Sequence, residues 1–242
     1  MQTYNKNNPS SIQALFNSIA KQYDKTNAVL SFQMHKKWNK ALIQQVLIPS
    51  KPKVLLDLCC GTGAIAFEYL QQAQHAVRAH LLDFSEGMLA HAKERSKAYW
   101  IDRHSIDYLQ ADAQCIPLPD HSVDCATIAY GIRNVKHPQQ CIHDVFRVLK
   151  PGGTFGILEL TQPEQPLLRF GHHIYLRTVL PIMGKFLTSN REAYQYLCNS
   201  INTFIPPQEL KRQLQEASFQ AIQHIPLLGG IATLLIAKKT HQ

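Results

Sequence analysis

The stretch KVLLDLCCGTGAIAFEYLQQA (residues 53–73) contains an apolar run, a glycine loop and an amphipathic segment in direct succession. KVLLDLC reads as a buried strand and AIAFEYLQQA as a helix. Gly61 and Gly63 let the backbone of the loop pass close to a ligand, and the helix that follows offers its N-terminal amides. The stretch therefore predicts a strand–loop–helix unit of an α/β fold, with a ligand at the loop.

The same alternation continues toward the C-terminus. Strands are expected at 76–84, 107–112, 122–130 and 154–160, and helices at 85–99, 138–149 and 206–217. Ser85 is the expected N-cap of the first of these helices, and KPGGTF (150–155) is expected to be a turn whose two glycines end the second. Two strand-like runs joined across Gly229-Gly230 close the chain as an antiparallel hairpin. Together these elements predict a doubly wound, seven-stranded, mostly parallel sheet.

Two segments lie outside this rhythm. Residues 1–50 read as helical, with apolar faces in 10–23 and 32–47, and are expected to form an N-terminal cap over the substrate. Residues 162–205 are apolar and partly basic, contain Pro181 and Gly184, and are expected to form a lid over the sheet. The length of 242 residues favours a single domain that spans 1–242.

The composition limits the classes of function. The net charge is +8, but lysines and arginines are scattered, so no basic face for nucleic acid is expected. The six cysteines form no C-x-x-C pair and are expected to be reduced and partly buried, with no metal site or disulfide set. No apolar run reaches the roughly 20 residues that span a bilayer, and the N-terminus lacks a secretory signal. A cytoplasmic protein is expected, with a peripheral contact to the membrane left open.

Acidic side chains stand at the ends of three successive predicted strands: Asp57, Asp83 and Asp112. Ligands of open α/β sheets bind at these carboxyl ends. GTGAIA (61–66) also fits the G-x-G-x-x-[GA] pattern of nicotinamide-dependent oxidoreductases, which keeps that class as an alternative. However, Asp57 would repel a pyrophosphate, whereas it suits a cationic amino-acid end. The residues therefore favour S-adenosylmethionine, with Asp83 on its ribose and Asp112 beside its adenine, where Ala113 leaves room for the ring.

The stretch AYGIRNV (129–135) places Arg133 and Asn134 directly after an apolar run and a glycine. Either this pair anchors a loop, with Arg133 paired to a carboxylate, or it faces a ligand. Because the glycine loop and the three aspartates already account for the cofactor, the pair is free to face a substrate.

DLCCGTG, LLDFSEGML, YGIRNV and RVLKPGG, together with YDKTN near the start and EAYQYL in the lid, resemble the ubiquinone/menaquinone biosynthesis C-methyltransferases. The resemblance covers nearly the whole chain. It implies cofactor contacts at Thr62, Asp83 and the Asp112-Ala113 pair, and substrate-end roles for Tyr23, Arg133 and Asn134. The sequence departs from the pattern at Ala64, where many members carry an acid, and at Ala129, where some carry a serine that contacts the cofactor.

What the resemblance implies is methyl transfer to a ring carbon of a prenylated hydroquinone, with demethylmenaquinol as the expected substrate and a benzoquinol precursor of ubiquinone as the alternative. Neither a metal nor a covalent intermediate is required. Arg133 would stabilise developing phenolate charge, directly or through a water, with Asn134 and Tyr23 orienting the ring oxygen. The N-terminal helices allow a homodimer, and a non-catalytic binding module is the alternative from another class.

The lid is expected to line an entrance for the isoprenoid tail, and its basic residues to touch anionic headgroups. His172 and His173 are expected to be exposed or core histidines, since no ligand set accompanies them. The residues expected at the entrance are Phe170, Ile174, Tyr175, Leu176, Val179, Leu180, Ile182 and Met183, and the basic residues are Arg169, Arg177 and Lys185.

Overall fold

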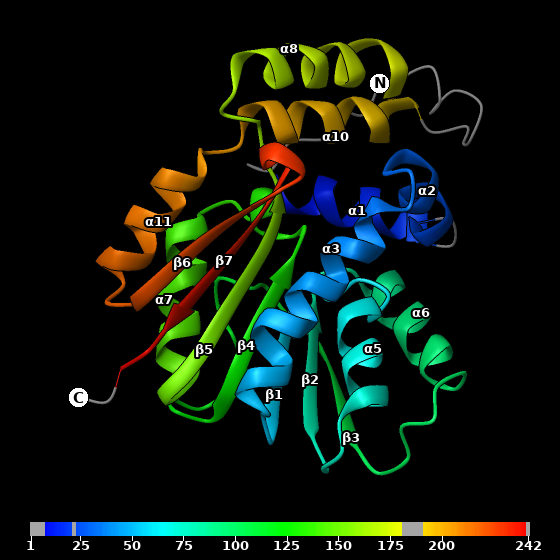
Figure 1. Cartoon of the computed structure of the whole chain (residues 1–242). Helices are drawn as coiled ribbons and strands as arrows, with labels where there is room; N and C mark the ends of the chain where they lie inside the picture. Colours follow the sequence, from blue (N-terminus) through cyan, green and yellow to red (C-terminus); the bar gives the residue numbers. More distant parts are fainter. Residues whose placement is uncertain (1–7, 21–22, 181–190, 241–242) are drawn as a thin grey trace.

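A seven-stranded sheet with helices on both faces forms the centre of the molecule (Figure 1). The computed structural model describes residues 8–20, 23–180 and 191–240. The strand order is β3-β2-β1-β4-β5-β7-β6, and β7 is antiparallel to both of its neighbours. The strands are β1 (Val54–Leu58), β2 (Arg78–Asp83), β3 (Ser105–Gln110), β4 (Val123–Ala129), β5 (Leu149–Leu160), β6 (Gln220–Leu227) and β7 (Ala232–Lys238). The predicted doubly wound, mostly parallel sheet is confirmed.

Two helical layers cover the sheet, which explains why the central strands are apolar on both faces. One core lies between the sheet and the pair α7 and α11; its members include Ile142, Val145 and Leu214. The other lies beneath α3, its π-helical continuation η2, and α5; its members include Leu42 and Phe67. The helices of these layers are α3 (Met34–Leu42), η2 (Ile43–Leu47), α4 (Ile48–Ser50), α5 (Ala64–Gln72), α6 (Glu86–Ser96), α7 (Pro138–Val148) and α11 (Pro207–Glu216).

The strand order reverses at the centre of the sheet. From β1 the chain proceeds outward through β2 to β3, and then returns to place β4 on the other side of β1. The loops after β1 and β4 therefore diverge at the carboxyl edge, where open α/β sheets bind ligands. The glycine loop follows β1, and AYGIRNV begins at the last residue of β4 and continues into the short helix η3 (Ile132–Asn134).

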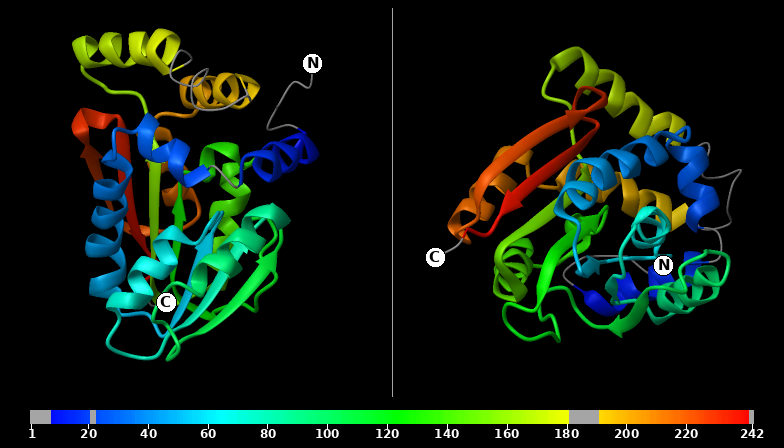
Figure 2. Two further views of the ribbon diagram at one scale, coloured as in Figure 1. Left: turned by 90° about the vertical axis from the view of Figure 1, so that its right-hand side faces the viewer. Right: turned by 60° about the horizontal axis from the view of Figure 1, so that its bottom comes forward.

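The N-terminal cap and the lid gather over this carboxyl edge (Figures 1 and 2). The expected helix at 10–23 is divided, because α1 ends at Ile19 and Tyr23 instead begins a second helix, α2. Leu30, Leu176, Leu180, Cys198 and Ile201 form a small core that packs cap and lid together. The elements are α1 (Pro9–Ile19), α2 (Tyr23–Leu30), α8 (Pro166–Ile174), η4 (Tyr175–Val179) and α10 (Arg191–Thr203).

The expectation that the glycines of KPGGTF end a helix is wrong. Helix α7 stops at Val148, and Leu149 is already extended and pairs with Val123. KPGG is an irregular part of β5, where the register with β4 shifts. Gly153 is needed there because a Cβ would lie 2.8 Å from the carbonyl oxygen of Lys150.

The expectations about the final hairpin turn and the Ser85 cap are confirmed. Gly229 and Gly230 adopt positive φ values of 65° and 93° in the turn between β6 and β7, and the hairpin is antiparallel. The Oγ of Ser85 accepts a hydrogen bond from the amide of Met88 at 3.1 Å, as an N-cap does. All six cysteines are free thiols, three of them buried. Among the described helices, none combines the length and apolarity needed to cross a bilayer.

Candidate active site

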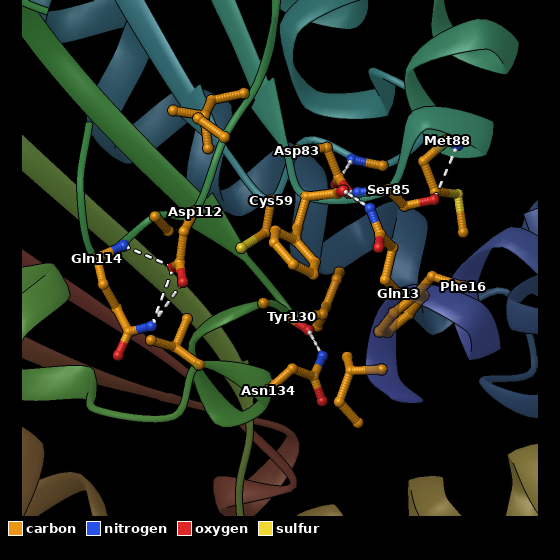
Figure 3. Close-up of a pocket in the computed structure, with 18 of the residues that line it drawn as sticks. Gln13, Phe16, Cys59, Asp83, Ser85, Met88, Asp112, Gln114, Tyr130 and Asn134 are labelled. Atoms are coloured by element: carbon orange, nitrogen blue, oxygen red, sulfur yellow. Dashed lines mark hydrogen bonds between the residues drawn. The ribbon is translucent and has the colours of Figure 1, made fainter. Parts of the chain in front are cut away.

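Two cavities meet at the carboxyl edge of the sheet. The first has about 800 Å³ of space, open in part to solvent, and lies over the ends of β2 and β3 (Figure 3). The second has about 1090 Å³ and lies between the glycine loop, the N-terminal cap and the lid. Both are lined by Tyr23, Cys59, Gly61, Ala129 and Tyr130. A ligand in the first cavity would therefore adjoin a ligand in the second.

The glycine loop needs both of its glycines, for different reasons. Gly61 has a φ of 54° and lines both cavities. Gly63 has a φ of 75°, and a Cβ there would collide with the ring of Phe67. Gly63 was predicted to bind the cofactor, but it lines neither cavity. It allows the turn of the loop instead.

Asp83 ends β2 and lies in the wall of the first cavity (Figure 3). Its Oδ2 accepts a hydrogen bond from the amide of Gly61 and its Oδ1 one from the amide of Ser85, both at 2.8 Å. Burial raises the pKa of this carboxyl above its ordinary value, while the amides oppose the rise. Each oxygen has a second lone pair, so the carboxylate can still accept from a diol.

Asp112 and Ala113 line the same cavity, two residues beyond the end of β3. The carboxylate of Asp112 is held by Gln114, whose amide and side-chain nitrogen donate to it at 2.8–3.0 Å (Figure 3). Ala113 is buried and its short side chain leaves the wall open. Lys136 is the one cation among the described residues that line this cavity.

Asp57 lies in the second cavity and is 1% exposed. Its Oδ1 accepts a hydrogen bond from the hydroxyl of Thr127 at 2.7 Å, whereas Oδ2 has no partner in the described part of the chain. Burial raises the pKa of Asp57 to about 7, although Thr127 and the amide of Ala66 oppose the rise. An unpartnered buried carboxylate oxygen is costly, and a cationic ligand would offset that cost.

The N-terminal cap is bound to the cofactor loops by polar contacts. The side chain of Gln13 donates to the carbonyl of Phe84 at 2.9 Å, and Asn17 Oδ1 accepts from the amide of Gly87 at 3.1 Å. Ile12 and Phe16 line the first cavity from the same helix. Helix α1 therefore closes one side of this cavity.

Thr62 lines the second cavity, and its hydroxyl is already engaged. It donates to Asp24 Oδ1 on α2 and accepts from Arg95 Nη1 on α6, each at 2.9 Å. Arg95 also donates to Asp24 Oδ2 at 2.7 Å. This Asp24–Thr62–Arg95 contact joins the cap to the glycine loop.

Arg133 is 7% exposed and lines the second cavity. Its Nη1 forms an ion pair with Glu159 and donates to the carbonyl of Tyr130, and its Nε donates to Ser200 on α10 at 3.3 Å. Burial disfavours the charge, but Glu159 together with Tyr23 and Tyr196 outweighs it, so the pKa of Arg133 is raised above the ordinary value. Both interpretations of this residue therefore have support, because the guanidinium is paired to a carboxylate and also lies beside the cavity.

Asn134 lines the first cavity rather than the second. Its Oδ1 accepts from the hydroxyl of Tyr196 on α10 at 2.9 Å, and its Nδ2 donates to the carbonyl of Tyr130 at 3.4 Å (Figure 3). Tyr23 lines both cavities, and burial raises its pKa while Arg133 lowers it. The predicted trio is thus brought to the junction, with Arg133 and Asn134 on different sides of it.

A set of polar residues in the cap was not recognised in the sequence analysis, apart from its first member, Tyr23. Tyr23, Asn27, Ser31, His35 and Asn39 occur at every fourth position of YDKTNAVLSFQMHKKWN, and all five line the second cavity. We call this set the period-four stripe. The residues come from α2, the turn after it and α3, and the tertiary arrangement of these segments brings them to one cavity. The stripe went unrecognised because Tyr23 was expected to end a helix rather than to begin one.

The lid residues divide differently from the expectation. Tyr175, Leu176 and Leu180 line the second cavity as expected, and His172 is buried beside them. Phe170 is 65% exposed, and Ile174 and Val179 are also on the outer face, so their assignment to the entrance is wrong. The helix turns these side chains away from the cavity. Ile182, Met183 and Lys185 lie outside the described residues.

Comparison with known proteins identifies the family. The chain matches the sequence profile of the ubiE/COQ5 methyltransferase family over residues 2–239. It is 52% identical over 239 residues to demethylmenaquinone methyltransferase from Protochlamydia amoebophila, with 99% of each chain covered. It is 36% identical over 231 residues to the ubiquinone/menaquinone biosynthesis C-methyltransferase UbiE of Bartonella quintana, covering 95% of this chain and 88% of that one.

Solved structures agree on the fold. A methyltransferase from Thermotoga maritima that depends on S-adenosylmethionine has a TM-score of 0.65 at 16% identity, covering 94% of this chain and 99% of its own. The cyclase SpnF has a TM-score of 0.63 at 16% identity, covering 85% and 81%. At this identity they support the architecture alone, whereas the profile and the two relatives extend along almost the full chain. The chain therefore belongs to the ubiE/COQ5 methyltransferase family.

Proposed function

We propose that this protein transfers a methyl group from S-adenosylmethionine to a ring carbon of a prenylated hydroquinone, with demethylmenaquinol as the substrate and menaquinol as the product. The observation that carries the proposal is the junction of two cavities of different chemistry. The first has Asp83 and Asp112 in its wall and suits the nucleoside end of the cofactor. The second is largely apolar, borders Asp57 and Thr62 where the methionine end would lie, and contains a buried guanidinium. The names of the relatives, the first of which acts on demethylmenaquinone, support the naphthoquinol ring.

The acidic residues fit S-adenosylmethionine better than a dinucleotide. Asp83 can accept from ribose hydroxyls, Asp112 from the adenine amino group, and the unpartnered Asp57 Oδ2 from the α-ammonium. Gly61 and Thr62 would border the methionine end, and Ala113 the ring. A pyrophosphate would meet these carboxylates with only Lys136 in the first cavity to balance it. When bound, the cofactor supplies an electrophilic methyl group.

The residues around the second cavity would position the ring and stabilise its charge. Arg133 retains Nη2 without a hydrogen bond in the described residues, which leaves one donor for a phenolate oxygen. Tyr23, at the junction of the cavities, would orient the same oxygen. Asn134 would act from the cofactor side. Glu159 keeps the guanidinium in place, because its carboxylate accepts hydrogen bonds from the backbone amide of Arg133 and from Arg133 Nη1.

The apolar wall suits an isoprenoid tail. Residues of α2, η4 and α10 contribute to it, and the cap (1–50) and lid (162–205) thereby form one enclosure over a single domain. The wall contains Leu30, Leu160, Leu176, Leu180, Leu197, Ile201 and Ile231.

We further propose a peripheral contact with an anionic membrane, where such a substrate resides. Among the described residues, the large apolar side chains that are exposed fall almost entirely on one surface, which we call the outer lid surface: Val29, Phe32, Leu167, Leu168, Phe170, Ile174, Val179 and Leu228. Phe32 packs near Tyr175, with ring centroids 6.2 Å apart. Arg169 and Arg177 are exposed on the same helices, and residues 165–180 contain no acid.

The proposed function is tested by an in vitro methylation assay. Reduced short-chain demethylmenaquinol and 2-polyprenyl-6-methoxy-1,4-benzoquinol are each offered with S-adenosylmethionine, and products are followed by mass spectrometry. We expect methylated naphthoquinol with the higher kcat/KM. Preference for the benzoquinol would favour a role in ubiquinone biosynthesis, which is part of the name of the Bartonella relative. Absence of product from both would contradict the quinone assignment, and calorimetry with a nicotinamide cofactor would then test the oxidoreductase alternative.

A further inference from the structure

The proposed reaction requires a proton acceptor that the residues discussed so far do not provide. A quinol hydroxyl must lose its proton as the neighbouring ring carbon becomes nucleophilic. Arg133 cannot accept that proton because it stays protonated. Asp24 is already bonded to Arg95 and Thr62, and Asp57 belongs to the cofactor end. His35 and His172 are the histidines that line the second cavity among the described residues.

The hydrogen bonds of Ser31 determine which nitrogen of His35 carries the proton. Ser31 Oγ uses its single proton to donate to the carbonyl of Asn27 at 2.7 Å. The same Oγ accepts from the backbone amide of His35 at 3.3 Å and lies 2.7 Å from His35 Nδ1. While Ser31 donates to the carbonyl of Asn27, its Oγ accepts from Nδ1–H. This arrangement assigns the Nδ1–H tautomer to the neutral imidazole and leaves a lone pair free on Nε2.

His35 also belongs to the period-four stripe, which lines the second cavity together with Arg133. The hydrogen bond to Ser31 fixes the ring as the orienting partner of a catalytic base does. His172, by contrast, forms no side-chain hydrogen bond with the described residues that would fix its tautomer, and it lies on the lid. The geometry thus distinguishes the two histidines.

We propose that His35 Nε2 is the general base that accepts the proton of the quinol hydroxyl, with Ser31 as the residue that positions it. This inference rests on the proposed function and adds a catalytic residue to it.

The step balances in protons and electrons. The O–H bond of the quinol breaks, its proton passes to Nε2, and the electron pair remains on oxygen, where Arg133 stabilises it. The electron pair on oxygen is delocalised into the ring, so the adjacent ring carbon can form a bond to the methyl group. The sulfur–methyl bond breaks at the same time, and its electron pair stays on sulfur. The ring carbon then releases its hydrogen as a proton to solvent water, and the electron pair of that C–H bond restores the aromatic ring. The ring oxygen, again a phenolate, takes back the proton held by His35.

The charge state suits this role at neutral pH. Burial lowers the pKa of His35 below its ordinary value, Lys36 lowers it further, and Asp24 on α2 opposes them. The imidazole is therefore neutral above about pH 6.5. The other titratable groups around the cavity are Tyr23, Asp57, Cys59, Cys60, Tyr130, Arg133, His172 and Tyr175.

The test compares three asparagine variants in the assay with short-chain demethylmenaquinol. In H35N the amide nitrogen can replace Nδ1–H toward Ser31, but no base remains. We expect kcat to fall by roughly 10²–10⁴-fold, with cofactor affinity by calorimetry and Tm close to wild type. H172N, at the other histidine of the second cavity, should lose less activity than H35N. The matched control is H143N, at an exposed histidine of α7 that lines neither cavity, and it should stay within about threefold of wild-type kcat. In His35→Ala, added imidazole should restore part of the activity, which a merely structural residue would not allow.

A second measurement does not depend on turnover. Nitrogen-15 NMR should show His35 as the Nδ1–H tautomer in the wild type, and as a tautomer mixture in Ser31→Ala. Wild-type kcat should also fall at acid pH with a single titration, absent from the residual activity of H35N. Retention of more than about a tenth of kcat in H35N, loss in H172N instead, or the Nε2–H tautomer in the wild type would each overturn the proposal. If H35N lost cofactor binding, the tautomer and the wild-type pH profile would decide. Wild-type protein inactive on both quinols would overturn the proposed function instead.

Discussion

Two buried polar residues of the proposed site, Asp57 and Arg133, are held at a cost to stability. Asp57 is 1% exposed and one of its oxygens has no partner, and Arg133 is buried against Glu159. A buried charge is tolerated only when it is paired or hydrogen-bonded. In the described structure Asp57 has a partner at Oδ1 and none at Oδ2. We infer that the ligand completes the pairing of Asp57. Removal of the Asp57 charge should therefore raise the stability of the cofactor-free protein and weaken cofactor binding.

The variant Asp57→Asn tests this at the residue scale. The folded pKa of about 7 lies above the ordinary 3.8, so the folded protein holds a proton that the unfolded chain has released. The free energy of unfolding therefore decreases as pH rises from about 4 to about 7. Asparagine keeps the acceptor for Thr127 and removes that decrease, so we expect the cofactor-free variant to gain on the order of 2 kcal/mol at pH 8. Denaturant titration at pH 5 and pH 8 measures the effect.

Cofactor affinity should change in the other direction. Calorimetry should show that Asp57→Asn binds S-adenosylmethionine at least about tenfold more weakly, one decade being about 1.4 kcal/mol. Asp120→Asn, which alters an exposed aspartate paired with Arg147, is the matched control and should leave affinity unchanged. Unaltered affinity in Asp57→Asn would refute the assignment of Asp57 to the cofactor.

At the scale of elements, two short helices decide how the site is closed. Helix α1 borders the first cavity, and α2 begins the period-four stripe that lines the second. Both are bound to the cofactor loops by side-chain contacts, namely Gln13 to Phe84, Asn17 to Gly87, and Asp24 to Thr62 and Arg95. We infer that these contacts help to keep the proposed cofactor cavity closed.

The variant Arg95→Met therefore should speed cofactor release. Methionine keeps the length of the side chain but removes the hydrogen bonds to Asp24, Thr62 and Tyr99. These side chains are partly exposed, so stability should change by less than about 1 kcal/mol. Stopped-flow fluorescence should show dissociation of S-adenosylhomocysteine accelerated by about tenfold, which is the expected consequence of losing about 1.4 kcal/mol of closure.

Arg212→Met provides the comparison for this prediction. Arg212 on α11 also pairs with two positions, Glu209 and Glu216, but it is more exposed than Arg95 and lines neither cavity. Its release rate should equal that of the wild type. Equal rates in Arg95→Met and the wild type would mean that the cap does not limit release.

For the whole molecule, the lid has two faces with different tasks. Its inner face lines the second cavity through His172, Tyr175, Leu176 and Leu180, and its outer face belongs to the outer lid surface. In Figure 1, α8 is the outermost element beyond the carboxyl edge of the sheet. A bilayer on this surface would lie next to the cavity proposed for a membrane-soluble substrate.

The double variant Leu167→Ser with Phe170→Ser should therefore weaken binding to vesicles that contain phosphatidylglycerol. Exposed apolar area contributes roughly 25 cal/mol per Å² when it enters the bilayer, so flotation should fall several-fold. Turnover of long-chain quinol in vesicles should fall with it, while turnover of soluble short-chain quinol should not. Wild-type binding should also weaken at high salt.

Trp100→Ser is the control for the double variant. Trp100 is 88% exposed, more than any other large apolar side chain described, and it lies outside the outer lid surface. Its removal should leave flotation unchanged. Loss of self-association rather than of flotation in the double variant, measured by light scattering, would assign the surface to a second copy of the chain.

Much of the fold was predictable because it depends on local patterns. The strand–loop–helix unit at 53–73, the parallel order and the final hairpin follow from periodicity and glycine placement, and all are confirmed. The irregular KPGG segment and the start of α2 at Tyr23 were not predicted. Both depend on contacts with distant parts of the chain, such as the pairing of Leu149 with Val123.

The sequence by itself determined the class of the protein and the edge at which its ligands bind, because strand ends and glycines are local features that any parallel sheet brings together. Tertiary structure alone decided three matters: that Arg133 is paired with Glu159, that Arg133 and Asn134 line different cavities, and that the period-four stripe faces one of them. These depend on contacts between residues far apart in sequence, as when Arg133 bonds to Ser200. Local sequence patterns do not specify which distant residues meet, so these arrangements became visible only in the folded molecule.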